Sequence, residues 1–264
     1  MQKLPRGYLS YNQIRTYQTC PLKYYLSYIE EVTVPVNEKI ILGSAFHESL
    51  EFYLREKIDG TIIPEKSLVT SFKTAFNRLV NSNEVDWGEP KSHILKKGIA
   101  FIQYFCQEVA EKLDPLMVEK DLSYTIPELG IELKGILDLI EKDFSISDFK
   151  TSNAKWSKNR VAYSKLQIII YKYLFENCFS SNASQLYFKV FYAKNEKNIK
   201  YQDLKVKFSD LDYENMIKVV KYISESIRAG HFYKNESYTC RFCDFKHICR
   251  NYGADGKKNE NPDT

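Results

Sequence analysis

The 264-residue sequence has no uninterrupted apolar run near the roughly 18 residues that a membrane-spanning helix needs. This absence excludes a membrane-spanning helix, and we expect no membrane partner. Its opening residues, MQKLPRGYLS, lack the apolar stretch of a secretory signal, and we expect a cytoplasmic, intracellular protein. Glycine and proline together number only 18, too few for a low-complexity or disordered chain. The 44% hydrophobic and 27% charged residues are typical of a globular protein with a buried core.

Positive charge is concentrated in one part of the chain, although the net charge is only +4. Residues 151–207 contain 11 lysines and arginines but 3 acidic residues. Tyrosine and phenylalanine are interleaved with these cations, as in surfaces that follow a phosphate backbone and stack bases. A lysine-rich solvated face is the alternative interpretation. Within this segment, Lys155, Lys158 and Arg160 are the candidates for contacting nucleic acid.

Hydrophobic periodicity predicts both helices and strands. Apolar residues at helical spacing predict helices over residues 10–17, 22–29, 43–57, 65–81, 92–113, 163–177 and 209–229. Alternation and turn signals predict a meander of strands over 116–127, 131–141 and 144–150, followed by strands over 186–193 and 200–208. This order predicts an α/β fold (mixed α+β) with one central mixed sheet flanked by helices.

Two carboxylates and a lysine lie on strands that are predicted to be neighbours. Asp138 lies on the second strand of the meander, and Asp148 and Lys150 lie on the third, its antiparallel neighbour. Residues i and i+2 of a strand share a face, so Asp148 and Lys150 point the same way. Two converging carboxylates repel each other unless a cation lies between them, and Mg²⁺ or Mn²⁺ suits hard oxygen ligands. An exposed hairpin with ordinary surface charges would show the same D-x-K pattern.

Two further patterns place polar side chains on helix faces. Gly43-Ser-Ala-Phe-His47 opens a predicted helix, and Gln167 and Tyr171 lie four residues apart on the helix after the D-x-K strand. A single histidine is often structural, and the three isoleucines between Gln167 and Tyr171 also suit packing. Neither pattern indicates a site by itself.

In combination, these motifs resemble the RecB-like branch of the PD-(D/E)XK nucleases. The resemblance covers about residues 8–250 and rests on LSYNQIRTYQTCPLKYYL, GSAFH, GILDLIE, SDFKTS, QIIIY and a cysteine-rich C-terminus. Similar proteins are stand-alone RecB-like exonucleases, including the CRISPR-associated type, and AddB-type nuclease domains of helicase–nuclease repair complexes. The resemblance implies a restriction-endonuclease-like fold in a single domain of residues 1–264. Its expected parts are a helical N-terminal part (1–115), a nuclease core (116–208), a C-terminal helix with a cluster segment (209–252) and a flexible tail (253–264).

The resemblance also implies roles for individual residues. Mg²⁺ or Mn²⁺ would be held by His47, Asp138, Asp148 and the backbone carbonyl of Phe149. Lys150 would be the catalytic lysine, and Gln167 and Tyr171 would lie near the bound DNA strand. Asp148 stands where many relatives carry glutamate, which shortens the reach to the metal by one methylene. Glu119 is expected to support the site from its periphery.

The cysteines are unevenly distributed. Cys106 and Cys178 lie in helical patterns among apolar neighbours, and we expect both in the core. Three others form C-x2-C-x5-C, and from spacing alone His247 or His231 would complete a zinc site, although His247 lies only two residues before Cys249. The resembled family instead combines an N-terminal Cys-Pro with three C-terminal cysteines in a [4Fe–4S] cluster. The residues that match this set are Cys20, Cys240, Cys243 and Cys249.

The motifs and the resemblance together predict a metal-dependent DNA nuclease. We expect an exonuclease acting on single-stranded ends, in DNA repair or recombination or in CRISPR-type DNA processing, with repair or CRISPR proteins as partners. The alternatives are a non-catalytic nucleic-acid-binding module with the same fold and a zinc-stabilised interaction protein. The His–Asp–Asp-x-Lys set favours the enzyme, because a binding module does not need converging charges.

Overall fold

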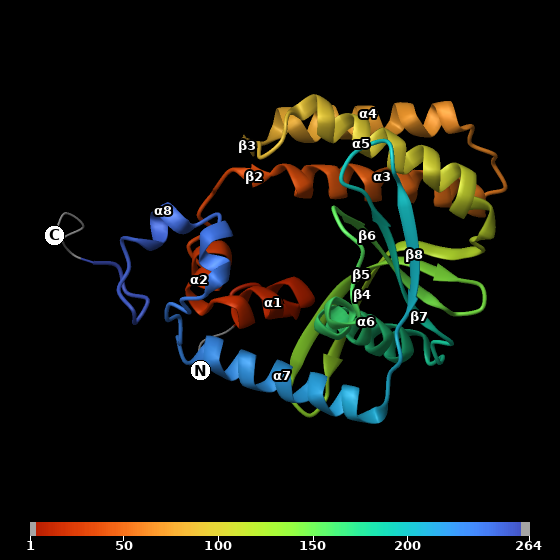
Figure 1. Cartoon of the computed structure of the whole chain (residues 1–264). Helices are drawn as coiled ribbons and strands as arrows, with labels where there is room; N and C mark the ends of the chain where they lie inside the picture. The colour runs from red at the N-terminus through yellow and green to blue at the C-terminus, as the bar shows by residue number, and fades with distance from the viewer. Residues whose placement is uncertain (1–3, 260–264) are drawn as a thin grey trace. The chain divides into compact units, whose positions relative to one another are not determined.

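The structure is a computed structural model that describes residues 4–259 (Figure 1). Its chain forms two compact units. One unit, here the nuclease unit, comprises Pro35–Leu122 and Ile136–Phe208. The other, here the cysteine unit, comprises Met1–Val34, Ser123–Gly135 and Ser209–Thr264. None of the helices within residues 4–259 has the length and apolarity that crossing a membrane requires.

The nuclease unit begins with helices. Its elements in this part are β2 (Val36–Asn37), α3 (Glu38–Ile58), α4 (Glu65–Ser82), β3 (Val85–Asp86) and α5 (Lys91–Tyr104), followed by a π-helical turn (Phe105–Val109) and a 3-10 turn (Ala110–Lys112). The close packing of α5 on α4 requires glycine at position 98, because an added Cβ there would lie 2.1 Å from Cζ of Phe72. These helices together form one layer of the unit.

The sheet of this unit is mixed. The strands after the helices are β4 (Pro115–Ile126), β5 (Ile131–Glu141), β6 (Ile146–Ser152), β7 (Leu186–Tyr192) and β8 (Lys200–Lys205). Residues 123–126 of β4 and 131–135 of β5 belong to the cysteine unit, and the remaining strand residues belong to the nuclease unit. β5 pairs with β4 on one side and with β6, in antiparallel orientation, on the other. β6 pairs in parallel with β7, and β7 pairs in antiparallel orientation with β8. A parallel pair needs a crossover connection, and α6 (Lys158–Phe179) supplies it between β6 and β7. Figure 1 shows α3, α4 and α5 on one side of these strands and α6 on the other.

Aromatic rings fill the space between the helical layer and the sheet. Phe46 of α3 lies 5.0 Å from Phe191 of β7, and Phe105 lies 6.5 Å from Phe149 of β6, measured between ring centroids. Such pairs contribute about 0.5–1.5 kcal/mol each beyond the burial of their area. Because Phe149 faces this core, its neighbours in sequence, Asp148 and Lys150, point to the other side of their strand, where Asp148 accepts a hydrogen bond from Gln167 of α6.

The cysteine unit joins both ends of the described chain. Its elements are β1 (Tyr8–Ser10), α1 (Tyr11–Thr19), α2 (Pro21–Tyr28), α7 (Asp210–Arg228), a 3-10 helix (Tyr238–Phe242) and α8 (Lys246–Cys249). β1 pairs in parallel with Glu132–Lys134 of β5. Tyr17 Oη donates to the carbonyl of His231 at 2.6 Å, and Leu22 N donates to the carbonyl of Tyr233 at 3.1 Å. These bonds hold α1 and α2 against the C-terminal segment.

The predicted fold class and the central mixed sheet flanked by helices are confirmed, with local differences. Helix α3 begins at Glu38 rather than residue 43, because the side chain of Asn37 caps it by accepting a hydrogen bond from Lys39 N. Helix α6 begins at Lys158 rather than 163, because Ser157 caps it in the same way. The prediction that Cys178 lies in the core is wrong: this side chain is exposed, since the buried face of α6 ends at Phe175. Cys106 is half-buried against the helical core.

Candidate functional site

A cleft of about 660 Å³ in the nuclease unit runs along one face of α3. Helix α3 contributes residues one turn apart, and β4 and β6 contribute the opposite wall. The lining residues are Lys39, Ile40, Gly43, Ser44, His47, Glu48, Glu51, Glu119, Lys150 and Thr151. Two of the sequence-predicted site residues, His47 and Lys150, therefore share one cleft.

β5 and β6 part at the carboxylates. Their pairing includes Ile140 with Ile146 and Leu139 with Ser147, and the same register would place Asp138 opposite Asp148. At that point a side-chain hydrogen bond takes the place of the backbone hydrogen bonds between the strands: Phe149 N donates to Oδ2 of Asp138 at 2.7 Å. The N–H and C=O of one strand residue face the same edge, so the carbonyl of Phe149 also faces Asp138. Both carboxyl-bearing residues lie where the two strands separate.

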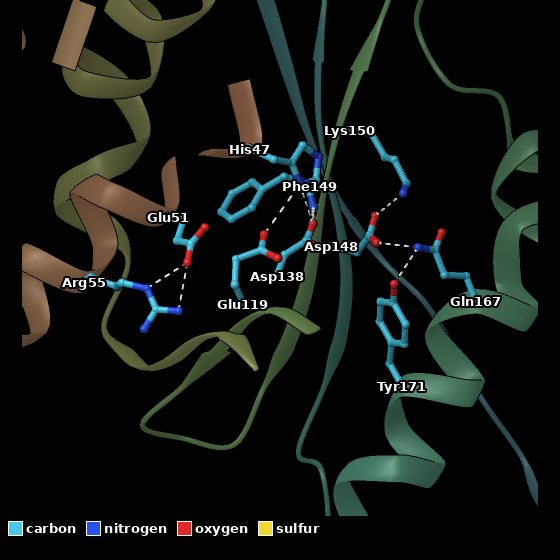
Figure 2. Close-up of polar contacts among 10 residues, drawn as sticks. All are labelled: His47, Glu51, Arg55, Glu119, Asp138, Asp148, Phe149, Lys150, Gln167 and Tyr171. Carbon is cyan, nitrogen blue, oxygen red and sulfur yellow. Dashed lines mark hydrogen bonds and ion pairs between the residues drawn. The ribbon is translucent and has the colours of Figure 1, made fainter. Parts of the chain in front are cut away.

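His47, Glu119 and Asp138 form a group whose ligand atoms all lie within 4.8 Å of one another (Figure 2). Nδ1 of His47 lies 3.3 Å from Oδ2 of Asp138 and 3.9 Å from Oε1 of Glu119. Helix α3, β4 and β5 thus each supply one donor. Glu119 adopts φ 45°, a left-handed conformation that costs a non-glycine residue about 1–3 kcal/mol. That conformation occurs at the residue whose carboxylate joins the group.

Asp148 has partners on both carboxylate oxygens. Oδ1 accepts from Nε2 of Gln167 at 2.7 Å, and Oδ2 lies 2.8 Å from Nζ of Lys150. Nε2 of Gln167 also donates to Oη of Tyr171 at 3.0 Å. Figure 2 shows Gln167 on α6 and Lys150 on β6 pointing to the same carboxylate. Asp148 is buried and, among the described residues, is not part of the His47, Glu119 and Asp138 group.

Burial and charge shift the pKa values in this site. Burial raises the pKa of Asp138, and it raises the pKa of Asp148 to about 6 although Lys150 opposes the shift. Burial alone would lower the pKa of His47, but the carboxylates of Asp138 and Glu119 outweigh it and raise this pKa to about 9. Each buried aspartate therefore has a cationic partner, the imidazolium of His47 or the ammonium of Lys150. A divalent cation would compete with these positive charges.

The predicted nucleic-acid contacts lie at the beginning of α6. Lys155, Lys158 and Arg160 are all exposed. The guanidinium of Arg160 lies 4.6 Å from the ring centroid of Trp156, and its Nη1 donates to Oγ of Ser152 at 3.2 Å. The first turn of α6 contains no acidic residue. Cations at the positive end of a helix dipole are unfavourable for the helix alone, and a bound anion would offset this.

The loop that carries these cations is held in place from two elements. Gln202 of β8 accepts from Trp156 N at 2.8 Å and donates to the Trp156 carbonyl at 3.3 Å. The buried Lys97 of α5 donates to Oδ1 of Asn153 at 3.1 Å. Sequence reasoning missed Lys97 and Gln202, because isolated polar residues in a helix and a strand carry no local signal of such long-range partners.

The four predicted cluster cysteines meet in the cysteine unit. Cys20, Cys240, Cys243 and Cys249 line one cavity of about 550 Å³, together with apolar residues such as Leu22 and Phe245. His247 is exposed and is not among the residues that line it, and neither is His231. Among the described residues, no three of these thiols lie within 4.8 Å of one another. Within any three of them, at least one separation is therefore wider than the roughly 3.8 Å between thiolates that share one tetrahedral zinc ion with 2.3 Å bonds.

A mixed sheet between helical layers, with carboxylates and a lysine where two strands part, defines a restriction-endonuclease-like protein. The chain belongs to the PD-(D/E)XK nuclease superfamily, whose family model matches residues 8–250.

Solved structures and curated proteins extend the comparison. A crystal structure of a protein from Eubacterium rectale, named “Putative exonuclease”, is similar with a TM-score of 0.59 and 13% sequence identity, over 94% of this chain and 93% of that one. The structure of SSO0001 has a TM-score of 0.37 and 14% identity, over 90% of this chain and 94% of that one. No curated protein matches the sequence.

Proposed function

We propose that the chain is a RecB-like, Mg²⁺- or Mn²⁺-dependent deoxyribonuclease that acts as an exonuclease on single-stranded DNA ends. One observation carries the proposal: the His47, Glu119 and Asp138 group and Lys150 line or border the same cleft, beside the buried Asp148. One imidazole and several carboxylates in one place suit a hard divalent cation. Membership of a nuclease superfamily supports phosphodiester hydrolysis as the chemistry.

The donor set fits a divalent cation. His47, Asp138, Asp148 and the carbonyl of Phe149 would hold it, and the placement of Glu119 adds that residue to the set. When bound, such a cation would lower the pKa of a water molecule and withdraw charge from the phosphoryl oxygens. The bonds from Phe149 N and Gln167 fix the orientation of the two aspartates before any ligand arrives.

Lys150 would act on the substrate directly. Its ammonium lies 2.8 Å from Asp148 and lines the cleft, so it can neutralise charge that develops on the phosphate and position the attacking water. With a cation held at the site, Asp148 would no longer need the charge of Lys150, and the ammonium would be available to the phosphate. Lys150 is therefore the residue whose loss should reduce turnover more than metal binding.

The beginning of α6 supports a single-stranded substrate. Lys155, Lys158 and Arg160 would neutralise phosphates of the strand that enters the site. Tyr163 is 63% exposed and lies one helical turn before Gln167, on the same face. An unpaired base can stack on such a ring, whereas a paired base cannot. Gln167 and Tyr171 would lie beside that strand.

The cysteine unit would hold a [4Fe–4S] cluster on Cys20, Cys240, Cys243 and Cys249. Thiolate-only ligation suits iron–sulfur chemistry, and all four thiols line one cavity without His247 or His231. A cluster places iron and sulfide between its ligands, so it suits separated thiols better than a single zinc ion does. Its proposed role is to bind the N-terminal and C-terminal segments of this unit together.

The exonuclease assignment and the pathway rest on similarity. The structural neighbour from Eubacterium rectale is named as an exonuclease, and the motif order resembles RecB-like exonucleases. We propose DNA repair, recombination or CRISPR-type processing as the setting, with proteins of those systems as partners.

Digestion of end-labelled single-stranded DNA with Mn²⁺ tests the proposal. Asp148→Asn and Lys150→Ala should each reduce the rate by at least about 100-fold, with Lys150→Ala keeping most of its Mn²⁺ affinity. The matched control is the exposed Lys142–Asp114 pair, 2.7 Å apart, changed to Lys142→Ala and Asp114→Asn. Cleavage by Lys150→Ala at the wild-type rate would refute the site. DNA binding by the wild type without any metal-dependent cleavage would favour a binding module instead.

A further inference from the structure

The 3-10 helix of the cysteine unit carries an exposed cluster of aromatic and cationic side chains. Tyr238 is 73% exposed and Phe242 is 68% exposed, and their ring centroids lie 5.7 Å apart in an edge-to-face arrangement. The guanidinium of Arg241 lies 5.1 Å from both ring centroids. We name these three residues the aromatic–arginine cluster. Large aromatic side chains are seldom left this exposed side by side without a binding role.

The cluster is held by its own backbone. Ser237 begins the 3-10 helix in a capping box with Cys240, and Cys240 N donates to the carbonyl of Ser237 at 3.0 Å. Nη1 of Arg241 donates to Oη of Tyr238 at 3.3 Å. Two rings and a planar guanidinium are thus arranged before binding, so little side-chain entropy remains to be lost when a ligand stacks on them.

The surroundings of the cluster are positively charged. Phe242 lines the cavity that also contains the four cysteines, and Lys23, Lys234, Lys246 and Arg250 line the same cavity. Its acidic lining residue is Glu236, and Asp244 nearby is paired with Lys23 at 3.2 Å. An uncharged apolar protein surface would gain nothing from these cations. Stacking rings among cations fit a polyanion with flat, unpaired rings.

We propose that the aromatic–arginine cluster is a second binding surface for single-stranded nucleic acid, formed by residues other than those that line the cleft of the nuclease unit. Unpaired bases stack on Tyr238 and Phe242, and Arg241 neutralises the phosphate between them. Neighbouring Lys246 and Arg250 extend the contact along the backbone of the strand. This surface goes beyond the proposed nuclease activity, because it binds nucleic acid whether or not the cleft cleaves it.

Binding measured without divalent metal tests the surface independently of cleavage. Fluorescence anisotropy of a labelled single-stranded oligonucleotide should show that Tyr238→Ala and Phe242→Ala each weaken binding about fivefold to 150-fold. Arg241→Gln should reduce the slope of log K against log salt by about 0.7, the value for one lost contact to a single strand. Tyr238→Trp and Phe242→Trp should retain binding, because a larger ring still stacks.

A matched control lies in the same unit. Tyr222 on α7 is 63% exposed, and Nζ of Lys221 lies 6.0 Å from its ring centroid. Lys221→Ala and Tyr222→Ala remove the same chemistry elsewhere and should leave binding unchanged. Wild-type thermal stability of the cluster variants confirms their folding. The proposal would be overturned if Tyr238→Ala and Phe242→Ala bind the oligonucleotide as tightly as the control variants do. It would also be overturned if Tyr238→Trp and Phe242→Trp lose as much affinity as the alanine variants.

Discussion

Nε2 of Gln167 lies 2.7 Å from Oδ1 of Asp148 and so connects α6 to β6 through two buried side chains. The same amide nitrogen donates to Oη of Tyr171 at 3.0 Å. An amide with a fixed donor direction can orient a carboxylate that a lysine alone would leave free to rotate. The crossover helix therefore takes part in the site through its side chains as well as through packing.

Gln167→Leu should weaken both metal binding and turnover by about 10–100-fold, because partners of metal-ligating carboxylates typically have effects of this size. It also leaves Oδ1 of the buried Asp148 without its donor, which costs about 1–3 kcal/mol of stability. Calorimetric titration with Mn²⁺ and steady-state cleavage measure the two effects. Tyr171→Phe is the control for Mn²⁺ binding, because it keeps the Gln167–Asp148 bond and removes only the hydroxyl that accepts from Gln167. An equal loss in both variants would contradict a role for that bond.

Metal affinity should rise with pH. The pKa of His47 is raised to about 9, so below that pH the imidazole carries a proton that a metal ion must displace. Between about pH 7 and pH 8, Mn²⁺ affinity should increase roughly tenfold, with about one proton released for each ion bound. Because the pKa of Asp148 is about 6, Mn²⁺ affinity should fall more steeply as the pH drops below that value. Calorimetry in buffers of different ionisation enthalpy measures the proton release.

His47→Gln should flatten this pH dependence as well as weaken affinity. His93→Gln is the matched control, because His93 is an exposed histidine on α5. If Mn²⁺ affinity still rises with pH to the same extent in His47→Gln, the displaced proton comes from another group.

Cys20→Ala should abolish the visible absorbance and the iron content of the anaerobically purified protein. Closing a long loop typically stabilises the folded state by about 2–4 kcal/mol, and each kcal/mol shifts the thermal midpoint by about 2–4 °C. Cys20→Ala should therefore also lower the thermal midpoint by about 4–16 °C. The bonds from Tyr17 and Leu22 to the C-terminal segment should still allow the variant to fold. Cys178→Ala, at an exposed position outside the cavity, should change neither property. Metal loss in His247→Ala but not in Cys20→Ala would establish the zinc alternative.

Neutralising the beginning of α6 should reduce the salt dependence of DNA binding. Lys155→Ala, Lys158→Ala and Arg160→Gln together should lower the slope of log K against log salt by about 2 for single-stranded DNA. Lys66→Ala, Lys73→Ala and Lys120→Ala remove three other exposed lysines of the nuclease unit and should have a smaller effect. Equal slopes in the two triple variants would assign residues 151–207 to an ordinary solvated face.

Local patterns were sufficient for much of the fold and part of the site. Strand alternation predicted the shared face of Asp148 and Lys150, and the turn after β5 predicted that Asp138 lies near them. These relationships extend over only a few residues, so the sequence contains all that they require. The carboxylate and lysine pattern can therefore be recognised from the amino-acid sequence alone.

Relationships between distant segments were harder to predict. The sequence predicts Glu119 only at the periphery of the site, whereas in the structure it joins His47 and Asp138 because β4, α3 and β5 converge; its left-handed backbone leaves no signature in the sequence. β1 was missed because three residues are too few to show a period. The exposure of Cys178 was missed because apolar spacing does not indicate where the buried face of a helix ends.

The cysteine unit is assembled from three separate segments of the chain, and this constrains the order of its folding. A ribosome releases α1 and α2 long before α7 and the last three of the four cavity cysteines. Until then, Leu22 and Leu26 lack the partners Phe245 and Tyr252 that bury them in the finished protein. The nuclease unit can therefore be synthesised completely while the apolar faces of the N-terminal helices still lack their packing partners. The four cysteines can line one cavity only after Cys249 has left the ribosome.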